Sequence, residues 1–299
     1  MNQDDQNQTF TSIAELEILA TIGELVAKHG SEAFTKIVNE AAYNRKSPFF
    51  IALAKNCQTF LKAYENLNYH PESNGECFIL QVLSKLFSQE TEVCIFDVGA
   101  NIGEWTLMAN QIFPTAKIHA FEIAHPTFKI LKSKTQAFSN IVANDYGLSD
   151  KIEEVQLRYF PNASTLTTIT EYPHNLDCVT IKGSVVNGDS YIQAHKIEHI
   201  HFVKIDVEGA EHLVLNGLLQ AISNKQIDVI QFEYGQVNII TKALLIVFYQ
   251  FFYGQGYKIG KIYPNYVEFT DYGFTQENFL GPNYLAIRQE RHDLIDALS

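Results

Sequence analysis

The spacing of apolar residues changes near residue 76. Before it, apolar side chains recur at helical intervals and predict three helices, over about 12–30, about 32–43 and from Ser47 to about Tyr64. After it, short apolar runs alternate with helical segments. We therefore expect a helical region over residues 1–72 and a larger domain over residues 73–299.

The larger domain alternates strands with helices. Strands are expected over Val93–Val98, Lys117–Glu122, Asn140–Asp145, His201–Asp206, Gln226–Glu233, Tyr257–Ile262 and Asn283–Arg288. Helices are expected over Glu76–Phe87, Gly103–Phe113, Pro126–Phe138, Ala210–Ser223 and Ile239–Tyr253, and a β-rich insertion over about 153–190. Such alternation predicts an α/β fold with a doubly wound parallel sheet, whose ligands bind at the carboxyl ends of the strands.

Composition and charge exclude several classes of protein. Of the 299 residues, 46% are hydrophobic, and the net charge is −12 without a basic cluster longer than two residues, so nucleic acid is not an expected partner. The start of the chain, MNQDDQNQTF, does not resemble a signal peptide, and no apolar stretch is long enough for a transmembrane segment. Four widely spaced cysteines fit reduced thiols. We therefore expect a cytoplasmic protein.

A glycine-containing turn follows the first predicted strand, in the run Asp97-Val98-Gly99-Ala100-Asn101-Ile102-Gly103. Gly99 and Gly103 permit a tight turn and a close approach of ligand to backbone. The carboxylate of Asp97 would repel the pyrophosphate of a dinucleotide but attract the ammonium group of S-adenosylmethionine. Asn101 replaces the second glycine of a dinucleotide motif, so S-adenosylmethionine is the expected cofactor.

Two further acids extend this predicted cofactor site. Glu122 ends the next strand, where an acid can accept hydrogen bonds from both ribose hydroxyls of an adenosine ligand. Asp145, in a polar turn that also contains Gly147, could accept a hydrogen bond from the adenine amine. The turn-forming tendency of such residues explains Asp145 equally well.

Together with Asn74-Gly75-Glu76, Lys204-Ile205-Asp206-Val207-Glu208-Gly209-Ala210-Glu211 and Asn283–Arg288, the cofactor run resembles the FkbM family of methyltransferases over about residues 74–289. The resemblance implies a class I methyltransferase (Rossmann-like) sheet with a reversed hairpin at one edge. It also implies methyl transfer from S-adenosylmethionine to a hydroxyl of a sugar or natural product, and it adds Glu76 and Asp206 to the cofactor-binding residues. Gly147 departs from the pattern, in which alanine is expected.

Carboxylates at the strand ends are candidates for the chemistry. A hydroxyl group needs a base or a metal ion to become a good nucleophile. Asp206 is placed to act as that base or as a positioning acceptor, and Glu233 ends the neighbouring strand. Alternatively, Asp206 and Glu233 could bind Mg²⁺. His212 is a further candidate base, whereas Glu208 could simply stabilise the start of a helix.

Several alternatives remain open at this point. The acceptor could be a glycan, a glycolipid, a polyketide-type molecule or an amine, and the protein could bind S-adenosylmethionine without catalysis or be a nicotinamide oxidoreductase. Residues 1–72 could be a packing element, a homodimer contact or a lid. Residues 160–165 are expected to form a mobile loop that contacts the substrate.

Overall fold

The computed structural model describes residues 23–24, 27–28, 30–90, 92–171 and 176–299. The predicted helix over 12–30 therefore lies almost wholly outside the described residues. The chain divides into two compact units, residues 1–65 and 66–299. In the smaller unit, α2 (Ser31–Ala41) and α3 (Pro48–Tyr64) form close to their predicted positions. Pro48 opens α3 because its fixed φ suits the first turn, where no backbone donor is needed.

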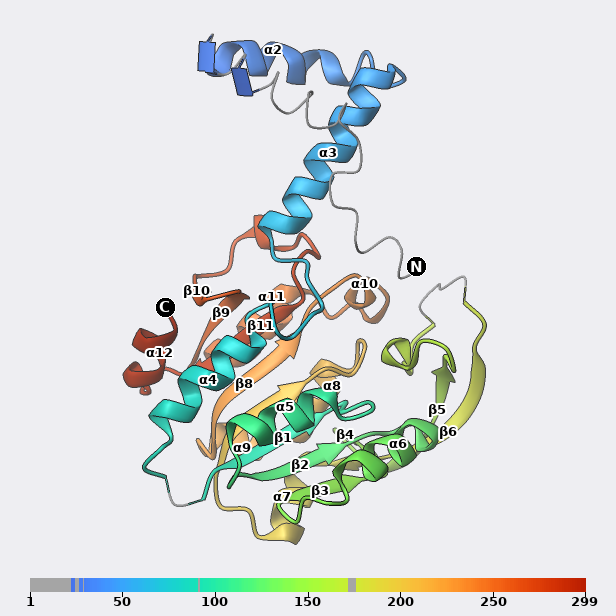
Figure 1. Ribbon diagram of the computed structural model, residues 1–299, viewed down its shortest axis with the longest axis vertical. Helices are drawn as coiled ribbons and strands as arrows, with labels where there is room; N and C mark the ends of the chain where they lie inside the picture. Colours follow the sequence, from blue (N-terminus) through green and yellow to red (C-terminus); the bar gives the residue numbers. More distant parts are fainter. Residues whose placement is uncertain (1–22, 25–26, 29, 91, 172–175) are drawn as a thin grey trace. The chain divides into compact units, whose positions relative to one another are not determined.

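The larger unit is built on an eight-stranded sheet (Figure 1). The strands follow the order β10-β9-β11-β8-β7-β1-β2-β3, and β11 runs antiparallel to its neighbours β8 and β9. The central strands from β8 to β3 are all parallel. Their bounds are β1 Cys94–Val98, β2 Lys117–Phe121, β3 Ile141–Asn144, β7 Ile200–Ile205, β8 Ile227–Glu233, β9 Tyr257–Tyr263, β10 Tyr266–Phe269 and β11 Asn283–Arg288. This topology confirms the predicted class I methyltransferase sheet and its reversed edge.

Helices cover both faces of this sheet (Figure 1). One face packs on α4 (Glu76–Leu86), α5 (Glu104–Ile112), α6 (His125–Thr135) and α12 (His292–Leu298). The other packs on α7 (Gly188–His195), α8 (Glu211–Gly217), α9 (Leu219–Ser223) and α11 (Leu245–Gly254). Because side chains alternate along a strand, Phe96 and Val98 pack on the second face, and Ile95 packs on the first. No helix among the described residues is long and apolar enough to cross a membrane.

Two predicted helices are each divided in the structure. The segment Ala210–Ser223 forms α8 and α9, and the segment Ile239–Tyr253 forms α10 (Val237–Thr241) and α11, separated by Lys242 with φ 59°. No proline or glycine marks the second break, so the apolar periodicity runs through it. The prediction also lacked β10 and α12, which are short.

The predicted β-rich insertion forms a separate three-stranded sheet in the order β4-β6-β5. Its strands are β4 (Gly147–Ser149), β5 (Glu153–Tyr159) and β6 (Val179–Asn187). The expected mobile loop over 160–165 instead leads into a short 3-10 helix, Ser164–Leu166. The insertion therefore begins with the polar turn after β3 and ends where α7 starts.

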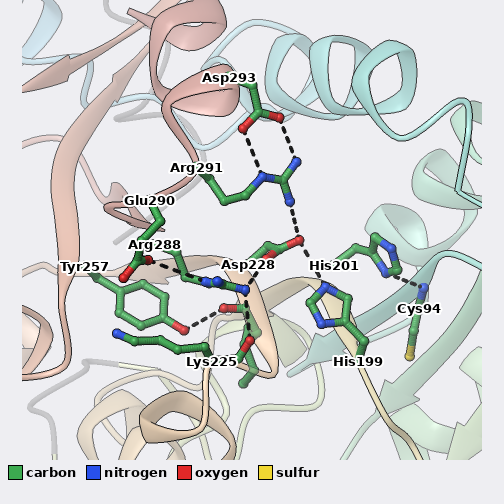
Figure 2. A network of polar contacts seen from close by, with 11 residues as sticks. Cys94, His199, His201, Lys225, Asp228, Tyr257, Arg288, Glu290, Arg291 and Asp293 are labelled. Atoms are coloured by element: carbon green, nitrogen blue, oxygen red, sulfur yellow. Dashed lines mark hydrogen bonds and ion pairs between the residues drawn. The ribbon is translucent and has the colours of Figure 1, made fainter.

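A polar network lies at the end of the main sheet where the parallel strands begin (Figure 2). Asp228, the second residue of β8, is buried and accepts from His199 Nε2 at 3.0 Å, Arg288 Nη1 at 3.2 Å and Arg291 Nη1 at 2.5 Å. Arg291 also pairs with the exposed Asp293 at the start of α12. One buried carboxylate thus joins β8, β11 and the C-terminal helix.

Candidate active site

Acidic residues gather at the carboxyl ends of the central parallel strands. Asp97 lies near the end of β1, Asp206 directly follows β7, and Glu233 ends β8. Glu122 directly follows β2. Because these strands are parallel and adjacent, their ends meet at one edge of the sheet. The structure therefore brings together acids that are up to 136 residues apart in the sequence.

Asp97 is a fully buried carboxylate with unused hydrogen-bonding capacity. Its Oδ2 accepts from Thr106 Oγ1 of α5 at 2.5 Å, but its Oδ1 finds no hydrogen-bond partner in the part of the chain that the structure describes. Burial raises the pKa of Asp97 to about 6, and the charge of Lys204 is the largest opposing effect. A buried acceptor without a partner is costly in a folded protein. Asp97 therefore offers an oxygen that a cationic ligand could use.

Glu76, the first residue of α4, repeats this arrangement. Its Oε1 accepts from Asn74 Nδ2 at 2.7 Å and from Asn283 Nδ2 at 3.3 Å, whereas none of the described residues donates to its buried Oε2. Gly75 has φ 106°, and a Cβ there would lie 2.2 Å from the carbonyl oxygen of Tyr263. Asn74-Gly75-Glu76 is therefore a tightly fitted element that directs one free carboxylate oxygen to a buried position.

The turn between β1 and α5 is closed against the end of β7. Gly99 has φ 90°, and a Cβ on it would lie 1.8 Å from the carbonyl oxygen of Asp206. Asn101 has φ 48°, and its backbone N donates to Glu122 Oε2 at 2.9 Å. Gly103, with φ 86°, precedes α5. The sequence signal for this turn was its glycines, and backbone geometry requires glycine at Gly99.

Glu122 is held by two backbone donors. Its second oxygen, Oε1, accepts from the backbone N of Ala124 at 2.8 Å. Burial raises the pKa of Glu122 to about 7, and the hydrogen bonds from Ala124 and Asn101 oppose that rise. Each carboxylate oxygen can accept a further hydrogen bond. This fixed carboxylate has the geometry and capacity to accept two hydroxyl groups.

The polar turn after β3 is more open. Asp145 Oδ2 lies 2.6 Å from His125 Nδ1, and both side chains are exposed to solvent. Gly147 begins β4, and a Cβ there would make an ordinary contact of 3.4 Å with the Cβ of Ile123. The expected alanine would therefore fit, and nothing in the structure explains its replacement by glycine.

Three carboxylates form a cluster beside the turn. Asp206, Glu208 and Glu233 each place one oxygen within 4.8 Å of the others. Burial, with the charge of Asp206 next in size, raises the pKa of Glu208 and of Glu233 well above the ordinary value. Glu208 has φ 52° and lies before α8, so the interpretation that it stabilises the first helical turn is wrong. The motif in which it follows Asp206 was the sequence signal for this third acid.

His212 lies apart from these carboxylates in its contacts. It is the second residue of α8, its Nδ1 has no hydrogen-bond partner, and the acid that acts on its charge is Asp150. Burial lowers its pKa. No hydrogen bond among the described residues joins His212 to Asp206 or Glu233, and its role as a base stays a prediction.

The insertion supplies contacts that the sequence did not reveal. Ser164 Oγ donates to Asn101 Oδ1 at 2.9 Å, and Thr168 Oγ1 donates to the carbonyl oxygen of Glu208 at 2.7 Å. The segment 164–168 therefore contacts both the glycine turn and the carboxylate cluster. The expectation that residues 160–165 contact the substrate stays a prediction, and it did not include these two hydrogen bonds.

Comparisons with known proteins identify the family of the chain. Residues 97–259, more than half of the chain, match the sequence model of the methyltransferase FkbM domain. Methyltransferase sdnD of Sordaria araneosa is 30% identical over 154 residues, which cover 42% of this chain and 60% of that protein. Hexuronic acid methyltransferase AglP of Haloferax volcanii is 26% identical over 162 residues, which cover 54% of this chain and 64% of that protein.

The match thus spans about three fifths of the length of these two relatives. Among solved structures, precorrin-6y C5,15-methyltransferase of Geobacter metallireducens aligns with 69% of this chain and 84% of its own, at 13% identity and a TM-score of 0.35. From the matched domain, which contains Asp97, Glu122, Asp206 and Glu233, we conclude that the chain belongs to the FkbM family of S-adenosylmethionine-dependent methyltransferases.

Proposed function

We propose that this protein transfers a methyl group from S-adenosylmethionine to a hydroxyl group of a sugar or natural product. The observation that carries the proposal is the pair of buried, unpartnered oxygens on Glu76 and Asp97 beside the fixed carboxylate of Glu122. The relatives support the acceptor class, because one is a hexuronic acid methyltransferase.

The residues of the candidate active site fit S-adenosylmethionine chemically. Asp97 and Glu76 would accept from its ammonium group, and Glu122 would accept from its ribose hydroxyls. Gly99 would contribute through the tight turn, because a Cβ there would collide with the carbonyl oxygen of Asp206. Asn101, Gly103, Asp145, Gly147 and Asp206 complete the proposed cofactor site. When bound, the cofactor supplies a methyl group on a positively charged sulfur, which leaves as a neutral thioether.

Asp206 is the proposed base. It directly follows β7 with its side chain 30% exposed, and Lys204 engages its Oδ2, while no described residue engages its Oδ1. The acceptor oxygen forms its bond to the methyl carbon while the carbon–sulfur bond breaks, and the hydroxyl proton passes to Asp206. Proximity and orientation of the two reactants supply much of the acceleration. Glu233 and His212 remain further candidates for handling the proton.

Mg²⁺ bound by the carboxylate cluster is the finer part of the proposal. Glu208 joins Asp206 and Glu233 as a possible ligand, and carboxylate oxygens are the ligands that Mg²⁺ prefers. If the cation takes part, turnover should stop in EDTA and return with Mg²⁺. Full turnover in EDTA would remove Mg²⁺ from the proposal and leave Asp206 as the base.

The first experiment is calorimetric titration with S-adenosylmethionine, S-adenosylhomocysteine and NADH, each with and without Mg²⁺. We expect binding of the two adenosyl ligands and none of NADH. Binding of NADH alone would favour an oxidoreductase. Methyl transfer is then measured with methyl β-D-glucopyranoside, methyl β-D-glucuronide and amine analogues. Transfer only to amines would replace O-methylation by N-methylation, and cofactor binding without any transfer would favour a non-catalytic protein.

The proposed base gives a specific prediction. Asp206→Asn should lower kcat about 10²-fold or more, because a general base contributes on this order. The Kd for S-adenosylmethionine should change little, since the amide side chain keeps the shape of the carboxylate. Asp296→Asn, at an exposed position of α12, is the matched control. Unchanged turnover of Asp206→Asn would exclude this role.

The partners of the whole protein stay predictions. Residues 1–72 are proposed as a packing element, a lid or a homodimer contact, and sedimentation of the protein would test the homodimer contact. Its cytoplasmic location and the lack of a nucleic-acid partner rest on composition and charge alone.

A further inference from the structure

Lys204 occupies a position that is unusual for a lysine, inside a sheet covered on both faces. It is the fifth residue of β7, is 6% exposed, and lies in register with Asp97 on β1 and Gln231 on β8. Its ammonium nitrogen lies 5.8 Å from the ring centroid of Trp105. Lysine is rarely buried unless its charge is matched. The buried ammonium group of Lys204 therefore needs a negatively charged partner nearby.

Its direct partner is the proposed base. Lys204 Nζ donates to Asp206 Oδ2 at 2.7 Å, and the two side chains are 7% and 30% exposed. The ion pair therefore joins a buried ammonium group to a partly exposed carboxylate at the carboxyl end of β7. No partner is found for Asp206 Oδ1 among the described residues, which leaves this oxygen accessible to an acceptor.

The charge of the same ammonium group also affects the pKa of acids at the ends of the neighbouring strands. It opposes the burial that raises the pKa of Asp97 to about 6. It likewise opposes the burial that raises the pKa of Glu208 and of Glu233. Among the described residues, Lys204 is the cation that acts on all of these carboxylates. It therefore lies between the proposed cofactor acids and the carboxylate cluster.

We propose that Lys204 is a positioning residue for methyl transfer: its ammonium group holds Oδ2 of Asp206 and leaves Oδ1 to take the hydroxyl proton. The inference rests on the proposed function. As the new carbon–oxygen bond forms and the carbon–sulfur bond breaks, the proton passes to Asp206, and the sulfonium charge is lost. A partly exposed carboxylate would otherwise rotate freely, and small errors in orientation cost large factors in rate.

A role in stability alone explains the arrangement less well. An apolar side chain of similar volume often serves a protein core as well as a buried ion pair or better. Lys204 instead places its charge near the ring of Trp105 and against the partly exposed carboxylate of Asp206. The arrangement thus places a buried charge at the position where orientation of Asp206 matters.

The test compares Lys204→Met, which keeps the length but not the charge, with Lys204→Arg, which keeps the charge. Methyl transfer is measured with the glucopyranoside and glucuronide acceptors above, and cofactor affinity by calorimetry. We expect Lys204→Met to lower kcat on the order of 10²-fold, with an unchanged acceptor KM. Its Kd for S-adenosylmethionine should change much less than kcat, because loss of Lys204 removes a charge that repels the cofactor ammonium but also one that opposes protonation of Asp97. Lys204→Arg should recover part of kcat.

Lys261 provides a matched control. It is also a buried lysine in the sheet, 5.8 Å from the ring centroid of Tyr263, but its Nζ donates to the carbonyl oxygen of Leu280. Lys261→Met should therefore keep kcat even where it lowers the melting temperature. Retained kcat in Lys204→Met, or a loss of cofactor affinity as large as the loss of kcat, would overturn the proposal.

A second measurement does not depend on the acceptor. The Nζ resonance of Lys204, assigned through Lys204→Arg, is followed by ¹⁵N NMR in the full chain. We expect Asp206→Asn to shift this resonance and to speed its proton exchange, whereas no change would overturn the ion pair. If the wild-type protein methylates no acceptor, the proposed function fails, while the NMR result still decides whether Lys204 holds Asp206.

Discussion

Individual buried acids in this protein keep hydrogen-bonding capacity that a ligand could use, at a cost to the stability of the fold. Asp97 and Glu76 each keep one buried oxygen without a partner, although a folded protein normally satisfies such groups. Glu122 is buried but engaged by two backbone donors, so it is fixed rather than free. A cation or hydroxyl donor that binds there would relieve an existing cost, which is a common feature of functional sites.

Cofactor affinity should therefore depend on pH. Burial raises the pKa of Asp97 to about 6 and that of Glu122 to about 7 in the ligand-free protein. Binding favours the ionised form of both acids, so affinity should be complete above about pH 8 and fall as the pH drops through 7 and then 6. Between about pH 8 and 5.5 we expect the Kd for S-adenosylmethionine to rise tenfold or more.

Calorimetry in buffers of different ionisation enthalpy measures this dependence, because binding near neutral pH should release protons. Glu122→Gln is the control: its affinity should be weaker at every pH and should vary less around pH 7. A Kd independent of pH would contradict the assignment of both acids.

At the level of elements, close packing of helix on strand decides which residues are possible. Gly217 ends α8, and a Cβ there would lie 1.8 Å from the carbonyl oxygen of Ser149 in β4. This contact holds the insertion sheet against a helix of the main domain. Segment 164–168 of the same insertion reaches the turn at Asn101 and the acid Glu208. Displacement of the insertion should therefore move the turn at Asn101 and the carboxylate cluster.

Two glycine substitutions test this packing. Gly217→Ala should lower the free energy of unfolding by about 2 kcal/mol or more, because the backbone of β4 must move. Gly254→Ala at the end of α11 meets no atom within 4 Å and should be neutral or stabilising by up to about 1 kcal/mol. Urea denaturation of both variants gives the comparison. Equal stability of the two variants would show that β4 yields without cost.

Across the whole molecule, the pKa of buried acids is shifted in opposite directions at the two ends of the central sheet. At the carboxyl ends of the parallel strands, the acids outnumber Lys204, the one buried lysine found there among the described residues. Burial raises the pKa of Asp97 and of Glu122 at this end. At the other end, burial by itself would raise the pKa of Asp228, but His199, Arg291 and Arg288 together hold it below its ordinary value. Stability is thus concentrated at one end and ligand-binding capacity at the other.

Loss of the stabilising end should be costly. Asp228→Asn should lower the free energy of unfolding by about 3 kcal/mol, because two arginines lose their buried partner. Because the folded-state pKa of Asp228 is depressed, its contribution should be present above about pH 4 and vanish as the pH falls further. Asp293→Asn removes an exposed partner of Arg291 and should cost less than about 1 kcal/mol. Thermal unfolding across this pH range would contradict the network if the two variants behaved alike.

The sequence by itself determined the layered fold and the identity of most strand-end acids. Apolar runs such as Cys94–Val98 are fully buried strands, and their alternation with helices leaves few topologies. Parallel strands place their carboxyl ends together, so Asp97, Glu122 and Asp206 could be assigned to one edge without coordinates. Local spacing and elementary charge arguments were sufficient for this.

The tertiary structure decided which atoms remain free and which contacts join distant segments. Glu208 belongs to the carboxylate cluster because its backbone, with φ 52°, lies outside α8. The contact of Ser164 with Asn101 spans 63 residues, and the break at Lys242 has no local signal. Such features depend on packing between elements, which the spacing of residues along one segment does not encode.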